Sequence, residues 1–195
     1  MFNQFKDTIR TATIPIAKAV PFSPNTLTVI GLLVSMAAAI AFARGYIIMG
    51  GALILISGVF DIFDGAVARA RGCMTSFGGV LDSVCDRYAD AVVFIGIMYG
   101  VLDGSIPTHA LFGISLWLWC ALALAGSLLV SYTRARAESA GVKKMDMGMA
   151  GRPERMVLLT AGAFSGQITW AVAAIVILAN ITIIQRMLYV KKHSA

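Results

Sequence analysis

Four aspartates at helical spacing are the residues of this sequence best suited to chemistry. Asp61 and Asp64 are three residues apart and Asp82 and Asp86 are four apart, so each pair lies on one face of a helix. Carboxylates beside strongly apolar segments are costly to bury and mark functional sites. Four of them form an all-oxygen site suited to hard cations such as Mg²⁺ or Mn²⁺, and they balance two divalent ions. Two-metal sites stabilise the attacking and leaving oxygens of a displacement at phosphorus.

The composition of the chain is that of a membrane protein. Of its 195 residues, 58% are hydrophobic and 13% are charged, whereas a soluble domain carries about 25% charged residues. The net charge of +6 indicates anionic membrane lipids and phosphorylated substrates as partners, and we expect no nucleic-acid partner for so apolar a chain. Apart from Arg44, the lysines and arginines fall near one face of the expected bundle, which the positive-inside rule makes the cytoplasmic face.

The hydropathy pattern predicts an all-α, polytopic membrane protein with six transmembrane helices and an N-terminal amphipathic surface helix. Residues 1–20 are expected to form the juxtamembrane amphipathic helix, and residues 21–195 the membrane domain. Six spans leave both termini and the aspartates on the cytoplasmic side of the cell membrane. The expected spans cover about residues 26–43, 47–71, 78–101, 110–132, 152–164 and 169–187.

The second and third spans position the aspartates. The second is longer than the ~20 residues that cross the hydrocarbon, so its last two turns project into the cytoplasm or a polar cavity. A turn at residues 72–77 makes the two spans antiparallel neighbours and brings all four carboxylates together. Gly65 and Gly78 allow two helices, or a helix and a phosphate, to approach closely. Arg69, one turn beyond Asp64, is able to bind a phosphate through two N–H groups.

The residues alone leave three alternative roles open for the aspartates. They are surface charges at helix ends paired with neighbouring arginines, or they line a cation transporter, channel or proton path. The third alternative is a membrane scaffold whose catalytic site has decayed. A path across the membrane requires carboxylates through its whole depth, whereas these cluster at one end of the two spans.

The aspartates belong to a longer pattern, Asp-x2-Asp-Gly-x2-Ala-Arg-x8-Gly-x3-Asp-x3-Asp, which runs from Asp61 to Asp86. At every fixed position it resembles the signature of the CDP-alcohol phosphotransferase family, and the six-span layout is similar as well. The resemblance implies a homodimeric membrane enzyme that transfers the phosphatidyl-type group of a CDP-linked lipid to an acceptor hydroxyl and releases CMP.

By position in this pattern, the resemblance implies a role for each residue. Asp61, Asp64, Asp82 and Asp86 would bind two divalent ions, Mg²⁺ or Mn²⁺. Asp86 would also be the general base that takes the acceptor proton. The CDP-linked lipid would contact residues of the first span, the motif and the turn that follows it: Pro24, Asn25, Thr26, Leu27, Gly65, Arg69 and Thr75.

A group of arginines bears on the identity of the acceptor. Arg134 lies at the end of the fourth span, and Arg152 and Arg155 open the fifth, on the same side as the aspartates. Arginines near a metal site form a phosphate receptor, to which helix N-terminal amides add. The alternative is positive-inside anchoring of the helix ends.

The segments around these arginines, Ser-Tyr-Thr-Arg-Ala-Arg-Ala-Glu and Arg-Pro-Glu-Arg, resemble the inositol-phosphate-using branch of the family. That branch makes phosphatidylinositol phosphate or, with archaeal ether lipids, archaetidylinositol phosphate. The resemblance implies 1L-myo-inositol 1-phosphate as a phosphorylated polyol acceptor, with its phosphate on the three arginines. Bacterial members usually have Lys at the position of Arg134 and Glu at that of Gly151, so these differences point to the archaeal branch. Glycerol 3-phosphate and L-serine are the alternative acceptors.

Overall fold

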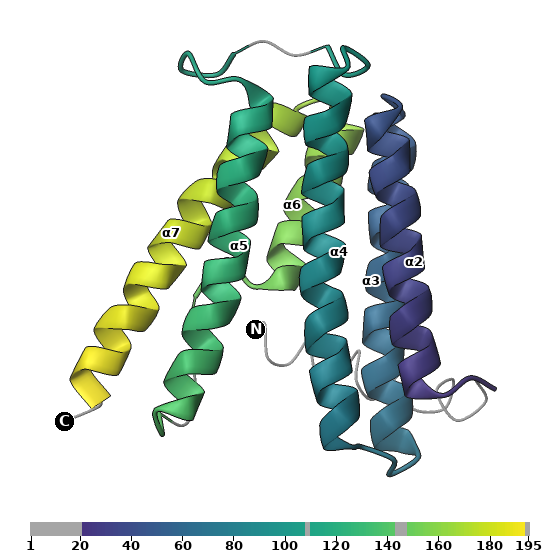
Figure 1. Ribbon diagram of the computed structural model, residues 1–195, viewed down its shortest axis with the longest axis vertical. Coiled ribbons are helices and arrows are strands. Elements are labelled where there is room, and N and C mark those ends of the chain that lie inside the picture. Colours follow the sequence, from purple (N-terminus) through teal and green to yellow (C-terminus); the bar gives the residue numbers. More distant parts are fainter. Residues whose placement is uncertain (1–20, 108–109, 143–147, 194–195) are drawn as a thin grey trace.

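The computed structural model describes residues 21–107, 110–142 and 148–193, and within these ranges the chain is all-helical, with six helices and no strand (Figure 1). The expected surface helix at residues 1–20 lies outside the described part. The helices are α2 Pro24–Ala43, α3 Ile47–Ala70, α4 Ser76–Leu102, α5 Leu116–Ser139, α6 Arg152–Phe164 and α7 Ile168–His193.

Four of these helices, α2, α3, α5 and α7, are long and apolar enough to cross a membrane. This supports the expectation of a membrane protein. Of the six expected transmembrane helices, four meet these length and composition criteria. Helix α4 differs from these four helices in that four charged side chains, Asp82, Asp86, Arg87 and Asp90, lie within its first 15 residues. Helix α6 has 13 residues, which cover about 20 Å at 1.5 Å per residue, less than the ~30 Å hydrocarbon core.

Helix α5 departs most from its expected bounds, because it begins and ends about two turns later in the chain. Before it, Leu111 and Ile114 close a tight turn with two backbone hydrogen bonds of 3.0 Å each. At its other end, an ion pair four residues apart, Arg134 with Glu138, continues the helix beyond the apolar segment. Local turn geometry and local pairing therefore outweigh hydropathy at both ends of α5.

Helix α2 joins the two helices that carry the aspartates. It packs against both α3 and α4, while α5 packs against α4 and α7, and α6 against α3 and α7. Helices α3 and α4 are antiparallel, as expected (Figure 1), but α2 provides the main packing between them. Gly96 allows this close approach, because a Cβ at this position of α4 would overlap the carbonyl oxygen of Ala39 in α2.

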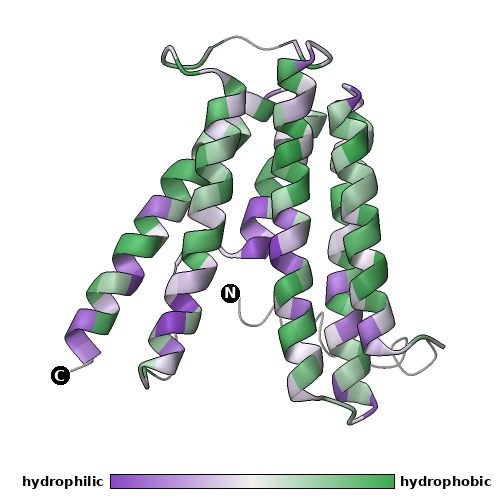
Figure 2. Ribbon diagram, viewed as in Figure 1, coloured by the Kyte–Doolittle hydropathy of each residue, from purple (hydrophilic) through white to green (hydrophobic). Residues whose placement is uncertain are grey.

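The main apolar core fills the end of the bundle remote from the aspartates. It is formed by all six helices, and Phe42, Ile97, Leu116 and Val172 are fully buried in it. Polar residues gather in the other half, along the end of α3, the first half of α4, the end of α5 and the start of α6 (Figure 2). The fold thus separates a packed apolar half from a half that carries the charges.

The α2–α4 approach predicts a large effect for a single methyl group. Gly96→Ala is expected to lower the free energy of unfolding by about 1–3 kcal/mol, because the added Cβ meets backbone atoms that cannot move aside. Thermal unfolding in detergent measures the effect. Gly79→Ala on the same helix is the control, since a Cβ there meets nothing within 4 Å. Equal melting temperatures for the two variants would contradict the packing argument.

Candidate functional site

Three of the four aspartates form one compact group of carboxylates. Carboxylate oxygens of Asp61 and Asp64 from α3 and of Asp82 from α4 all lie within 4.8 Å of one another. Thr28 of α2 donates a 2.6 Å hydrogen bond to Oδ2 of Asp64, which is buried. Oδ1 of Asp82 is also buried and, in the described part of the chain, has no hydrogen-bond partner. Mutually repelling carboxylates with an unpaired buried oxygen fit a divalent cation as their common partner.

The fourth aspartate, Asp86, faces an arginine. Nη1 of Arg152, the first residue of α6, donates to Oδ1 of Asp61 at 2.5 Å and also contacts Oδ1 of Asp86. Arg87 adds a second positive charge 3.8 Å from Oδ2 of Asp86. Arg152 therefore compensates one carboxylate from each aspartate pair and connects α6 to both α3 and α4.

An open cavity of about 210 Å³ lies on the other side of the carboxylates, between the start of α2, the end of α3 and the start of α4. Asp64 and Asp82 form part of its wall. The cavity brings together five of the seven residues that were predicted to contact the CDP-linked lipid: Pro24, Asn25, Gly65, Arg69 and Thr75.

The remaining two of the seven, Thr26 and Leu27, lie outside the lining of this cavity. The Thr26 hydroxyl is 2.8 Å from that of Ser23, the residue that caps α2. Leu27 is 3% exposed and packs on Ala66 and Val67 of α3. In the structure, Thr26 therefore takes part in capping α2, and Leu27 packs α2 against α3.

The wall of the open cavity is suited to an anion. The N-terminus of α2 and that of α4 both border it, and their free N–H groups favour negative charge. Thr75 caps α4 by accepting a 3.0 Å hydrogen bond from the amide of Gly78. Gly65 leaves room for the Arg69 side chain, because a Cβ at Gly65 would lie 3.1 Å from a guanidinium nitrogen of Arg69.

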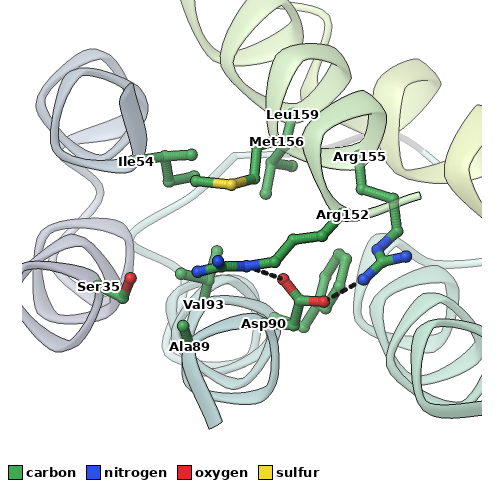
Figure 3. Close-up of a pocket in the computed structure, with 10 residues that line it drawn as sticks. Ser35, Ile54, Ala89, Asp90, Val93, Arg152, Arg155, Met156 and Leu159 are labelled. Atoms are coloured by element: carbon green, nitrogen blue, oxygen red, sulfur yellow. Dashed lines mark hydrogen bonds and ion pairs between the residues drawn. The ribbon is translucent and has the colours of Figure 1, made fainter. Parts of the chain in front are cut away.

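The three arginines predicted to bind the acceptor phosphate are only partly brought together. Arg152 and Arg155 line a second, much smaller cavity of about 20 Å³ beside α4 (Figure 3). Arg134 lies outside that lining, on α5, where its Nε donates to Glu138 at 2.9 Å and its side chain is 50% exposed. Of the three arginines expected to meet there, only Arg152 and Arg155 line this cavity.

Three residues that the sequence did not point to take part in the site. Thr28 donates a hydrogen bond to a carboxylate of the three-aspartate group, and Asp90 contacts the arginine pair. Thr182 of α7 accepts 3.1 Å hydrogen bonds from the amides of Met149 and Ala150, which fixes the backbone just before α6. Asp90 has a sequence signal, since it continues the i,i+4 spacing of the α4 aspartates. The two threonines act across 32 to 36 residues of chain and have none.

Comparison with known proteins agrees with this geometry. The sequence model of the CDP-alcohol phosphatidyltransferase family matches residues 22–187. Archaetidylinositol phosphate synthase from Methanothermobacter thermautotrophicus is 42% identical, over 97% of this chain and 94% of that protein. Phosphatidylinositol phosphate synthase from Mycobacteroides abscessus is 37% identical, over 93% of this chain and 84% of that protein.

Solved structures of phosphatidylinositol phosphate synthase from Mycobacterium tuberculosis are similar in fold. The structure with CDP-DAG bound has a TM-score of 0.77 and 31% identity, covering 91% of this chain and 92% of that chain. The structure in complex with manganese and citrate has a TM-score of 0.78 and 31% identity, covering 91% and 88%. The manganese in the second structure agrees with the oxygen donor set that Asp61, Asp64 and Asp82 provide here.

The carboxylate group predicts the effect of removing one charge. Asp82→Asn is expected to weaken Mn²⁺ binding by about 2 kcal/mol or more, roughly 30-fold in Kd, because one of three anionic ligands is lost. Isothermal titration calorimetry of the purified protein with Mn²⁺ measures this. Asp103→Asn is the control, because Asp103 lies at the far end of α4, where it accepts a hydrogen bond from Ser105. An unchanged Kd for Asp82→Asn would exclude Asp82 as a ligand.

Proposed function

This chain belongs to the CDP-alcohol phosphatidyltransferase family, and we propose that it transfers the phosphatidyl-type group of CDP-diacylglycerol or CDP-archaeol to 1L-myo-inositol 1-phosphate and releases CMP. The observation that carries this proposal is the position of the carboxylates between two cavities. Asp64 and Asp82 line the open cavity, and Asp61 contacts an arginine of the second cavity. A donor and a phosphorylated acceptor would then meet at the carboxylates. The names of the relatives, synthases of archaetidylinositol phosphate and phosphatidylinositol phosphate, support the choice of acceptor.

The open cavity is the proposed site of the CDP group. Arg69 would bind the diphosphate together with the N-terminal amides of α2 and α4. Pro24, Asn25 and Thr75 would contact the nucleotide, and Gly65 leaves space for it to approach α3. Thr26 and Leu27 would act by fixing the start of α2. Because the cavity is open, the lipid chains of the donor are able to remain in the membrane.

Asp61, Asp64, Asp82 and Asp86 are the proposed ligands of Mg²⁺ or Mn²⁺. When bound, the divalent ions supply positive charge that stabilises the attacking and leaving oxygens at phosphorus. Thr28 keeps Asp64 oriented through its 2.6 Å hydrogen bond. This outer contact fixes one ligand before any substrate enters.

Asp86 is the proposed general base. Arg152 contacts its Oδ1, whereas Arg87 lies 3.8 Å from its Oδ2, beyond hydrogen-bond distance. Oδ2 would therefore accept the proton of the acceptor hydroxyl. The hydroxyl oxygen forms a bond to the phosphorus that carries the lipid. The bond from that phosphorus to the bridging oxygen breaks, and CMP leaves with the electron pair.

Arg152 and Arg155 are the proposed partners of the acceptor phosphate, and Arg134 would join them from α5. The Nε groups of Arg152 and Arg155 are buried and, among the described residues, have no hydrogen-bond partner. Arg155 is only 4% exposed. Buried donors without partners are costly in a folded protein, so an anion entering the second cavity would gain two ready hydrogen bonds.

We further propose that all six helices lie in the cell membrane, with the aspartates and both termini facing the cytoplasm. The ends of α3, α5 and α7 near the charged half carry Arg69, Arg136 and Lys191 in their last turns, in accord with the positive-inside rule. Helix α6 would cover only part of the membrane depth. Residues 21–195 would form the transferase domain and residues 1–20 a surface helix, and the homodimer implied by the family resemblance belongs to this proposal.

The experiment that tests the proposed function is an acceptor panel. CMP release from CDP-archaeol and from CDP-diacylglycerol is measured with 1L-myo-inositol 1-phosphate, glycerol 3-phosphate and L-serine. Turnover with the inositol phosphate is expected to exceed that with the other two acceptors. Turnover with serine alone would overturn the choice of acceptor, because serine carries no phosphate for the arginines. Ion flux without CMP release would favour the cation transporter.

The proposed base makes a separate prediction. Asp86→Asn is expected to lower kcat by about 100- to 10,000-fold, the usual contribution of a general base. Because Asp86 lies outside the lining of the open cavity, binding of the CDP-linked lipid is expected to persist. Steady-state CMP release gives kcat, and calorimetric titration with the lipid gives its Kd. If the variant no longer bound the lipid, a base role for Asp86 would not explain the loss of turnover.

A further inference from the structure

Asp90 lies on α4 one helical turn beyond Asp86, outside the motif and outside the three-carboxylate metal group. Its two carboxylate oxygens face different arginines of α6 (Figure 3). Oδ2 accepts a hydrogen bond from Nη2 of Arg155, and Oδ1 lies 3.9 Å from Nε of Arg152. The Asp90 side chain is 12% exposed, so this contact is shielded from solvent.

Besides Asp90, the two arginines contact different parts of the molecule. Arg152 reaches Asp61 and Asp86 with Nη1, and Arg155 donates from Nη1 to the carbonyl oxygen of Ala150 at 2.7 Å. A single carboxylate thus lies between an arginine that contacts the reacting carboxylates and an arginine that is tied to the loop before α6.

The charges make this arrangement necessary. Two guanidinium groups on the first turn of one helix repel each other, and among the described residues Asp90 is the acidic side chain that pairs with Arg155. A shared carboxylate removes the repulsion and fixes the spacing of the two groups. Binding sites whose charged groups are already oriented lose less affinity to ordering when the ligand arrives.

We propose that Asp90 is a positioning residue that holds Arg155 and Arg152 toward the phosphate of the acceptor, and so sets the affinity for phosphorylated acceptors. This inference rests on the proposed function. Asp90 touches neither substrate nor metal and acts through the two guanidinium groups. The opposing possibility is an ion pair that serves only to dock α6 on α4.

The test is a double-mutant cycle on acceptor KM, with Asp90→Asn, Arg155→Gln and the combined variant. Asp90→Asn is expected to raise the acceptor KM by about 10- to 100-fold, the range typical of residues that orient a ligand-binding group. The KM for the CDP-linked lipid and the Kd for Mn²⁺ are expected to stay within about twofold, since neither site involves Asp90. The effects of the two single changes are expected to be less than additive in the combined variant, because both changes remove the interaction between Asp90 and Arg155.

Two results would overturn the inference: an acceptor KM that Asp90→Asn leaves unchanged, or additive effects in the cycle. Asp90→Glu covers the case in which Asp90→Asn does not fold, because it keeps the charge and moves the carboxylate by one methylene. If Asp90 positions the arginines, Asp90→Glu is expected to raise the acceptor KM at an unchanged melting temperature. If the ion pair only docks α6 on α4, neither the KM nor the melting temperature is expected to change. A wild-type protein that releases no CMP with any phosphorylated acceptor would instead overturn the proposed function, and this inference with it.

Discussion

Negative charge concentrated at one end of apolar helices is the constraint on which the rest of this structure depends. Two unit charges about 4 Å apart repel by about 4 kcal/mol at the effective dielectric of a protein surface, and the three grouped carboxylates have oxygens within 4.8 Å. A single hydrogen bond such as that from Thr28 contributes about 1 kcal/mol. Hydrogen bonds alone are therefore insufficient, and cations or bound protons are needed to offset the repulsion. The protein supplies one positive charge as Arg152, and Asp61, Asp64 and Asp82 together offer oxygen donors that suit a divalent metal.

The same carboxylates separate two chemically different surroundings. On one side lies an open cavity walled by helix N-termini, Arg69 and small residues, which suits a nucleotide diphosphate. On the other lies a smaller cavity lined by Arg152 and by the buried Arg155, the proposed partners of the acceptor phosphate. Helix α2 contributes to both walls, since Thr28 borders the first and Ser35 the second. Close α2–α4 packing at Gly96 therefore has a direct bearing on how the two substrates would be aligned.

The sequence predicted those features that depend on local spacing. Apolar runs and breaking residues predicted the bounds of most helices but not those of α5, and the spacing of the aspartates predicted that their carboxylates lie close together, as three of them do. Contacts between distant segments could not be predicted from the sequence: Arg152 donates a hydrogen bond to Asp61 across 91 residues, and Thr28 donates one to Asp64 across 36. Arg134 was grouped with the other arginines because all three are basic and near helix ends. Its own helix offers Glu138 one turn away, and that local partner pairs with it.

The order in which the chain is made separates the aspartates from their arginine in time. At about 5–20 residues per second, the 91 residues between Asp61 and Arg152 take on the order of ten seconds to synthesise. During that interval α3 and α4 carry carboxylates that the later helix has not yet neutralised. The first half of the protein therefore contains the chemistry but not its charge balance. A chain that stops before α6 therefore lacks the contacts that Arg152 makes with Asp61 and Asp86 in the whole protein.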